Sequence, residues 1–260
     1  MSILYSLGWD VGTWKCKGDS QDALQLLAWE NGTPKAIGTS FHGNLWKQTG
    51  GHCEVDDLLK AVEAPELSGS DRLVIGIDAV FGRPEVFLGL LNGETNFAPD
   101  VSAMNTDNRY LYRETERFLI DALHLKSPYL PKTAVGDAIG TAATKAQHFI
   151  AQLSNRDECY VPPLDAWDIE RASSSRITII EVYPGATKAS GAFGDLDIPA
   201  GAKMESLGKT DPEDALRCAM VGGCYAKSIG AIEADLPDVY LPSELGADLC
   251  REGWIFRPRK

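Results

Sequence analysis

Acidic side chains interrupt or end apolar segments at several separate points of the chain. Asp10 follows LGW, Asp78 follows LVIGI, Glu181 lies within ITIIEVYP, and Asp211 and Asp214 belong to TDPEDALRCA. An ionised carboxylate in apolar surroundings costs free energy unless a cation or hydrogen-bond donors compensate its charge. Carboxylates that converge suit a metal-dependent site for phosphoryl transfer or phosphodiester cleavage. Such oxygen ligands favour Mg²⁺ or Mn²⁺ over zinc.

The elements that must position these acids are predicted from apolar periodicity and turn residues. We expect three successive antiparallel strands, at residues 3–11, 23–29 and 34–39, with a hairpin turn at residues 31–33. Helical spacing follows over residues 54–64, and nearly continuous apolar runs predict two further strands. These strands span residues 72–80 and 176–183. A last helix, apolar on most sides, is predicted from residue 211 to about residue 233.

Residues 81 to about 174 carry few strand signals, and we interpret them as a mostly helical insertion. The resulting order is that of a ribonuclease H-like α/β fold, with a mixed five-stranded sheet flanked by helices in a single domain, residues 1–260. In that fold the first and fourth strands are neighbours, so Asp10 and Asp78 should lie side by side. Asp211 and Asp214 are three residues apart, and therefore share one face of the last helix.

Composition and charge limit the partners that the chain can have. A net charge of −12 disfavours a broad nucleic-acid-binding face, but allows a local contact beside a cation-loaded site. No apolar stretch approaches the roughly 20 residues of a membrane span, and the start of the chain lacks a secretory signal. The six cysteines form no C-x-x-C pair. We therefore expect a cytoplasmic protein with reduced thiols and no membrane partner.

Several motifs resemble, in order, those of a known family. They are GWDVGT, IGIDAVFG, NRYLYRETERF, IIEVYPGA, TDPEDALRCA and EGWIFRP, and together they span nearly the whole chain. This pattern is similar to that of the domain-of-unknown-function family 429, whose members are regarded as predicted nucleases of the ribonuclease H superfamily. The resemblance implies an acidic centre made of Asp10, Asp78, Glu181 and Asp214. Asp211 matches the additional acid of the last helix.

The acids and the resemblance together predict a nuclease that hydrolyses phosphodiester bonds of RNA or DNA by a two-metal-ion mechanism. Asp10, Asp78 and Asp214 would be metal ligands, with Asp211 as a further one. Glu181 would act as a fourth ligand or would orient the attacking water. Three of these acids also have structural interpretations, because Asp10 could cap the turn that follows it, Asp211 suits a helix N-cap and Glu181 could pair with an arginine.

A stripe of arginines recurs every four residues at Arg109, Arg113 and Arg117, which predicts one flank of a helix. One interpretation is a solvated face paired with Glu114 and Glu116. The other is a set of clamps for substrate phosphates beside the acidic centre, since the guanidinium fork suits phosphate oxygens. The family resemblance favours the second interpretation for Arg113.

The turn that follows the first strand allows a different function. Asp10-Val11-Gly12-Thr13 is also the phosphate-binding turn of the actin, sugar-kinase and chaperone ATPase superfamily, in which Gly12 and Thr13 would donate to a nucleotide phosphate. Those enzymes use two copies of the fold, whereas this chain holds one convincing copy. The pair Gly222-Gly223, which resembles an adenosine-binding pair, lies within a helical pattern. A non-catalytic binding module is the third alternative.

Overall fold

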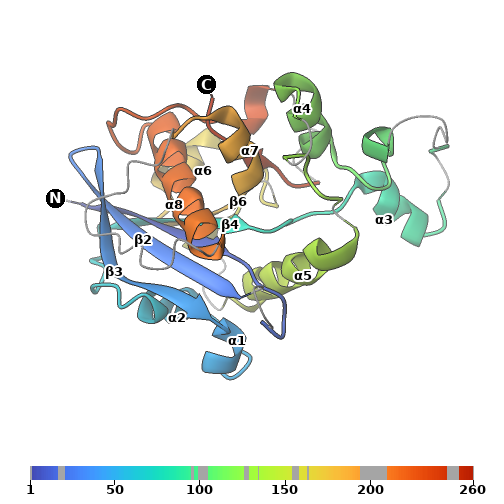
Figure 1. Cartoon of the computed structure of the whole chain (residues 1–260). Coiled ribbons are helices and arrows are strands. Elements are labelled where there is room, and N and C mark those ends of the chain that lie inside the picture. The colour runs from blue at the N-terminus through green and yellow to red at the C-terminus, as the bar shows by residue number, and fades with distance from the viewer. Residues whose placement is uncertain are drawn as a thin grey trace.

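The computed structural model describes residues 2–16, 21–94, 97–98, 105–125, 129–133, 135–153, 158–162, 164–193, 210–244 and 252–259. Its centre is a mixed sheet in the order β3-β2-β1-β4-β6-β5, with β7 paired to β6 (Figure 1). The strands are β1 (Leu4–Asp10), β2 (Asp22–Glu30), β3 (Thr33–Gly43), β4 (Arg72–Asp78), β5 (Cys159–Tyr160), β6 (Ile177–Val182) and β7 (Ile255–Phe256).

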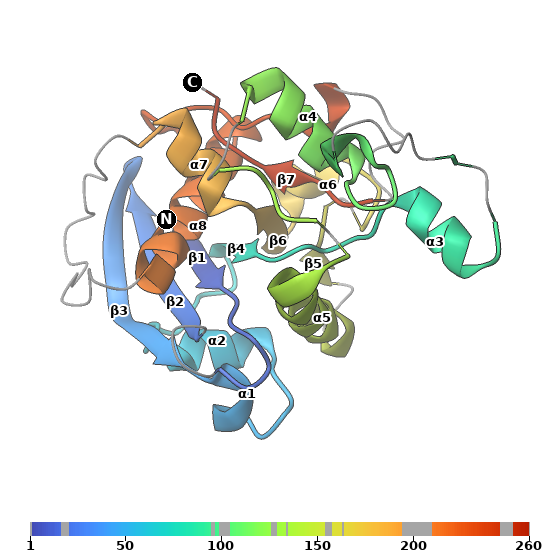
Figure 2. The same cartoon turned by 45° about the vertical axis from the view of Figure 1, so that its right-hand side comes forward.

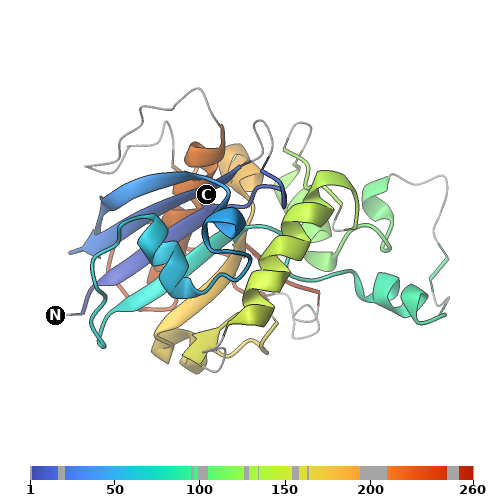
Figure 3. The same cartoon turned by 90° about the horizontal axis from the view of Figure 1, so that it is seen from below.

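Helices cover both faces of this sheet. They are α1 (Leu45–Gln48), α2 (Val55–Ala61), α3 (Glu85–Leu91), α4 (Glu114–Leu123), α5 (Asp137–Gln152), α6 (Ile169–Ser174), α7 (Pro184–Ser190) and α8 (Thr210–Ser228). Short 3-10 turns lie at Asn105–Asp107 and Pro242–Glu244. Seen from below, α2 and α5 cross one face of the sheet, while α8 lies behind it (Figure 3). Each face therefore has its own apolar core.

The predicted neighbours in the sheet are confirmed. β1 pairs antiparallel with β2, β2 pairs antiparallel with β3, and β1 pairs in parallel with β4. The hairpin turn between β2 and β3 has the left-handed backbone of a primed turn, with φ of 51° at Asn31 and 75° at Gly32. The parallel pairing of β1 with β4 makes Asp10 and Asp78 direct Cα partners.

The structure differs from the predicted sheet in its number of strands, which is seven and not five. β5 and β7 have two residues each, too few to leave an alternating pattern in the sequence. β5 lies within the predicted helical insertion, which otherwise holds α3, α4, α5 and α6. The Pro184-Gly185 pair ends β6 as expected but also begins α7, because proline suits the first turn of a helix.

The last helix, α8, begins at Thr210 and ends at Ser228, so Asp211 lies in its first turn and does not cap it. Two glycines let this helix approach the sheet closely, and they are Cα partners of each other. A Cβ atom on Gly8 would lie 1.8 Å from the carbonyl oxygen of Ala215, and one on Gly76 would lie 2.5 Å from that of Cys218. The backbone of α8 therefore rests directly on β1 and β4.

None of the cysteines in the described part of the chain forms a disulfide. Cys16, Cys53, Cys159, Cys218 and Cys224 carry free thiols, and Cys250 lies outside the described residues. Of the helices that the structure describes, none combines the length and the apolar character that crossing a membrane requires.

Replacing Gly8 with alanine should lower the free energy of unfolding by about 3 kcal/mol, because the added methyl group forces α8 away from β1 and overpacking costs roughly this much. Without that contact alanine would be the better strand residue. Urea denaturation followed by circular dichroism measures the change. Gly69→Ala is the matched control, since a Cβ atom there meets nothing within 4 Å. Equal stability of the two variants would contradict the close approach of α8.

Candidate active site

Two carboxylates lie side by side where adjacent parallel strands end. Asp10 is the last residue of β1, Asp78 is the last residue of β4, and both are partly buried. Among the residues that the structure describes, neither side chain has a hydrogen-bond or ion-pair partner. Asp214 comes to the same place from α8, because the contact between Gly8 and Ala215 presses this part of the helix onto β1. Three predicted site residues are thus brought together.

The charge of this cluster changes the protonation of its members. Burial, and then the negative charges of Asp78, Asp214 and Asp211, raise the pKa of Asp10 well above its usual range. Burial, and then Asp214 and Glu181, raise the pKa of Asp78 to about 8. Like charges at close range disfavour ionisation, so the site holds more carboxylates than its surroundings can neutralise. A bound cation would remove this imbalance.

A lysine that sequence reasoning missed lies against the third carboxylate. Lys188 Nζ is 2.6 Å from Asp214 Oδ1, and both side chains are mostly buried. Burial raises the pKa of Asp214, although Lys188 opposes the rise. The lysine reaches this position because α7 begins directly after β6, at Pro184. The helix-start signal of that proline could have placed Lys188 at the site, one turn into a new helix.

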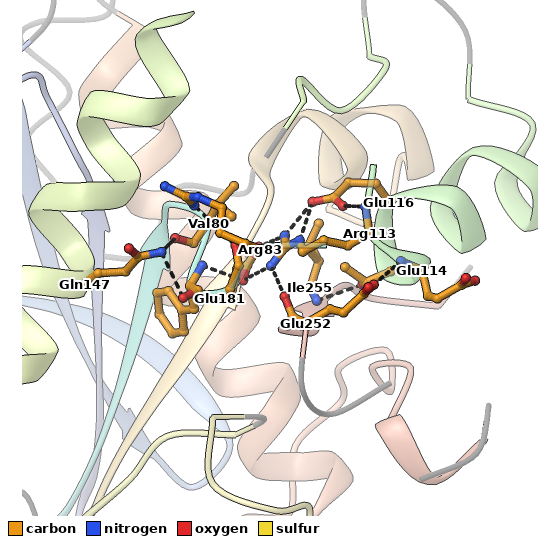
Figure 4. A network of polar contacts seen from close by, with 12 residues as sticks. Val80, Arg83, Arg113, Glu114, Glu116, Gln147, Glu181, Glu252 and Ile255 are labelled. Carbon is orange, nitrogen blue, oxygen red and sulfur yellow. Dashed lines mark hydrogen bonds and ion pairs between the residues drawn. The ribbon is translucent and has the colours of Figure 1, made fainter. Parts of the chain in front are cut away.

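The carboxylate of Glu181 is paired with an arginine and a backbone N–H group. Its Oε2 accepts hydrogen bonds from Arg113 Nη1 at 2.9 Å and from the Phe81 backbone N–H at 3.0 Å, and its Oε1 contacts Arg113 Nη2 (Figure 4). The side chain is only 2% exposed. This arrangement fits the structural interpretation, in which Glu181 pairs with an arginine. Both carboxylate oxygens are thus engaged, and the predicted role as fourth metal ligand or water-orienting group stays a prediction.

Arg113 is an interior residue and does not reach a substrate. Its side chain is fully buried, with Nε 2.8 Å from Glu116 Oε1 and Nη1 2.9 Å from the backbone oxygen of Glu252 (Figure 4). Together with Glu181, these acceptors engage the guanidinium on several sides. The predicted phosphate contact by Arg113 does not fit this burial, and the arginine instead joins β6 to α4 and to the C-terminal segment.

The other two arginines of the stripe lie on a solvated surface. Arg109 Nη2 is 3.4 Å and Arg117 Nη1 is 2.8 Å from Glu114 Oε1. The prediction of one helical flank is wrong for two of the three, because α4 begins at Glu114 and only Arg117 lies within it. Arg109 and Arg117 thus form the ion-paired face that was the alternative interpretation, and neither contacts the carboxylates at the strand ends.

Asp211 lies beside the cluster and faces the start of β2. Its Oδ2 accepts from the Gln21 backbone N–H at 3.4 Å and lies 3.5 Å from His42 Nε2.

A small cavity of about 20 Å³ borders Asp78, and has room for about one water-sized group. Across the described part of the chain, no three His, Cys, Asp or Glu side chains lie together as a ready metal shell. Movement of side chains would be needed to close one.

A buried ion pair fixes the turn after β1. Lys145 Nζ lies 2.7 and 2.6 Å from the two carboxylate oxygens of Asp22, and both side chains are fully buried. Asp22 Oδ1 also accepts the backbone N–H of Gly12 at 3.1 Å, and the Thr13 carbonyl accepts from Lys145 at 3.3 Å. Neither Asp22 nor Lys145 carries a local sequence signal, because their partnership spans two distant segments. The predicted substrate contact by Thr13 stays a prediction.

This arrangement weighs against a nucleotide-binding turn. The N–H of Gly12, which such a turn would offer to a phosphate, is already donated to Asp22. The glycine pair Gly222-Gly223 lies inside α8, where a Cβ atom on Gly223 would fall 2.0 Å from the ring of Trp29. These glycines therefore serve the packing of α8 on the sheet.

Comparison of the chain with protein-family models, with curated proteins and with solved structures found no match. What the site can do chemically must therefore follow from its own geometry. That geometry consists of two neighbouring carboxylates at strand ends, a third on α8 and a lysine beside the third.

Replacing Arg113 with methionine should lower the free energy of unfolding by about 3–5 kcal/mol, because it strands two buried carboxylates. Arg117→Ala is the matched control, and the loss of its exposed pair should cost less than about 1 kcal/mol. Urea denaturation compares both with the unchanged protein. If Arg113→Met proved as stable as the control, the arginine would not hold these elements together.

The stability of the protein in EDTA should fall as the pH rises from about 4 to 8. The folded chain keeps the proton of Asp78 up to its raised pKa of about 8, whereas an unfolded chain releases it near its ordinary value of about 3.9. The folded state thus binds more protons in this window, and the free energy of unfolding must decrease with pH there. Asp78→Asn, which cannot titrate, should reduce the decrease.

Thermal melts from pH 4 to 9 measure this effect. Asp235→Asn, an exposed change beyond the C-terminal end of α8, should leave the pH dependence as in the unchanged protein. Parallel curves for Asp78→Asn and the unchanged protein would contradict the charge crowding at the strand ends.

Proposed function

We propose that this chain hydrolyses phosphodiester bonds of RNA or DNA with Mg²⁺ or Mn²⁺ held by Asp10, Asp78 and Asp214. One observation carries the proposal: Asp10 and Asp78 are Cα partners at adjacent strand ends, and neither carboxylate has a hydrogen-bond or ion-pair partner among the described residues. The order β3-β2-β1-β4-β6 is the one expected for a ribonuclease H-like sheet. The resemblance of the motifs to family 429 supports the same fold and activity.

The donor set fits a hard divalent cation. Asp10, Asp78 and Asp214 supply carboxylate oxygens from three different elements, as an ion of this kind prefers. Burial raises the pKa of all three, and for Asp10 and Asp78 the neighbouring carboxylates raise it further; a divalent charge would relieve this repulsion. Because Glu181 is engaged by Arg113, a second ion would depend on Asp211 as its additional ligand.

Divalent ions at such a site would polarise the phosphate and lower the pKa of the attacking water. The residues of the chain would hold and orient the reacting groups. To serve as a ligand through Oδ1, Asp214 would exchange its contact with Lys188, whose ammonium lies 2.6 Å from that oxygen. The released Lys188 would then face the scissile phosphate, where a fixed positive charge stabilises the charge of the transition state. Lys188 would thus neutralise Asp214 before the substrate binds and the scissile phosphate afterwards.

Purified protein with Mg²⁺ or Mn²⁺ should cleave at least one member of a panel of labelled RNA and DNA oligonucleotides, single-stranded or structured. EDTA should abolish the activity. Asp78→Asn and Asp214→Asn should lower the rate at least about a hundredfold, since even outer-shell changes at metal sites cost roughly 10–100-fold. Asp235→Asn, remote and exposed, should cleave at the unchanged rate.

Calorimetric titration with Mn²⁺ separates binding from catalysis. If Asp78→Asn bound Mn²⁺ as tightly as the unchanged protein, the carboxylates at the strand ends would not be the metal site. If the unchanged protein bound Mn²⁺ but cut no substrate of the panel, the metal site would stand and the nuclease activity would be refuted.

A further inference from the structure

We propose that the hollow between the turn after β1 and helix α1 binds a single-stranded segment of nucleic acid. In this proposal the indole of Trp14, which precedes the lining residue Lys15 in the chain and lies outside the lining itself, stacks on an unpaired base at the rim, and Lys15 and Lys47 contact backbone phosphates. The proposal deepens the proposed function, on which it rests for the choice of a nucleic acid, by assigning a substrate-binding surface to the same site.

The hollow has a volume of about 470 Å³ and is lined by Lys15, Cys16, Gln21, Asn44, Lys47 and Gln48. The turn after β1 and helix α1 lie next to each other at one end of the sheet (Figure 2). Every residue of the lining except Cys16 offers a lysine ammonium or a side-chain amide. Such a surface suits a ligand with oxygens of negative or partial negative charge.

Two lysines give this surface a positive charge that the chain as a whole lacks. Lys15 and Lys47 are exposed, and no carboxylate among the described residues pairs with either. Asn44 ties the backbone segments that carry them together, since its Nδ2 donates to the carbonyl of Trp14, next to Lys15, at 3.2 Å and its Oδ1 accepts from the Lys47 backbone N–H at 2.9 Å. In a protein of net charge −12, this local pair is where a phosphate backbone would be attracted.

Trp14 is exposed and yet held in place. The side chain has 38% of its surface accessible, although its Nε1 donates to Thr144 Oγ1 at 3.1 Å. Its ring packs edge-on against Trp46, with centroids 5.5 Å apart, and lies 5.6 Å from the ring of His148. A tryptophan that only filled the core would be covered. A fixed indole with an open surface can accept a base with little loss of conformational freedom.

The hollow is connected to Asp211, beside the carboxylate cluster, through Gln21. Trp14 and Lys15 follow Asp10 by four and five residues, and Gln21 both lines the hollow and donates its backbone N–H to Asp211. A strand seated here would therefore pass close to Asp211, which lies beside the carboxylates at the ends of β1 and β4. A single aromatic platform with two cations suits a strand whose bases are unpaired, because a paired base cannot leave its stack to lie on an indole.

Fluorescence anisotropy with 5′-fluorescein-labelled 12-mers of deoxythymidine and of uridine, in EDTA to prevent cleavage, tests the proposal. The double change Lys15→Ala and Lys47→Ala should lower the slope of log affinity against log salt by about 1.4, since each single-strand phosphate contact contributes about 0.7. Trp14→Ala should weaken binding about tenfold or more, which corresponds to the usual effect of losing one base stack. Trp14→Phe should retain most of the affinity.

Lys35→Ala with Lys60→Ala is the matched control, because it removes the same charge from exposed lysines of β3 and α2. This control should change the salt slope by less than the Lys15 and Lys47 pair. Unfolding midpoints equal to that of the unchanged protein show that each variant is folded. The proposal is overturned if both double variants weaken binding equally, if Trp14→Ala binds like the unchanged protein, or if the unchanged protein binds neither 12-mer.

Adenosine monophosphate serves as a competitor. If adenosine monophosphate displaced the 12-mers at a concentration equal to the dissociation constant of the 12-mers, the hollow would be assigned to a mononucleotide and the proposal would be overturned. Failure of the nucleic-acid surface can also be distinguished from failure of the metal site. An intact effect of Trp14→Ala together with unchanged Mn²⁺ binding by Asp78→Asn would refute the metal site and leave the nucleic-acid surface standing.

Discussion

The candidate site depends on how closely the backbone of α8 approaches β1 and β4. Gly8 and Gly76 are Cα partners in these parallel strands, and the absence of a Cβ atom at both lets carbonyl oxygens of α8 lie directly above them. Parallel pairing aligns the ends of the two strands, so Asp10 and Asp78 meet at one edge. The close helix then adds Asp214 at the same edge. Side chains at either glycine would separate the third carboxylate from the other two.

The charged side chains near the ends of β1 and β4 fall into two groups, those in buried ion pairs and those without an ion-pair partner among the described residues. Asp22 with Lys145 on one side, and Glu181 with Arg113 on the other, are paired and hydrogen-bonded, as buried ions must be if they are not to destabilise the fold. Both pairs join segments far apart in the sequence, and so hold the turn after β1 and the insertion in place. Asp10 and Asp78 lie between these pairs in the strand order, and neither has a hydrogen-bond or ion-pair partner among the described residues. A fold that neutralises its structural charges and leaves two carboxylates together points to a cation, not to a defect of packing.

Sequence patterns were sufficient for the elements that repeat a clear period, and insufficient for contacts between distant segments. The strands that hold Asp10 and Asp78, their adjacency and the closely packed last helix could all be predicted, because apolar runs and fold-level pairing rules determine them. β5 and β7 are too short to leave a period. The role of Arg113 was missed because a helix beginning at Glu114, and not before, puts that arginine in the interior. Lys188 required recognising that Pro184 both ends a strand and begins a helix.

The lysine beside Asp214 gives the site a resting arrangement of its charges. Without a positive group, three carboxylates at one edge would repel one another and destabilise the fold, as the raised pKa values of Asp10 and Asp78 already express. Lys188 forms an ion pair with Asp214 and, like Lys132, partly opposes the rise in the pKa of Asp78, while neither Asp10 nor Asp78 has an ion-pair partner among the described residues. A cation would therefore gain most from Asp10 and Asp78 first, and Asp214 would follow once Lys188 turned to another anion. A phosphate of the substrate is such an anion, so in the proposed mechanism binding of substrate and completion of the metal site would favour each other.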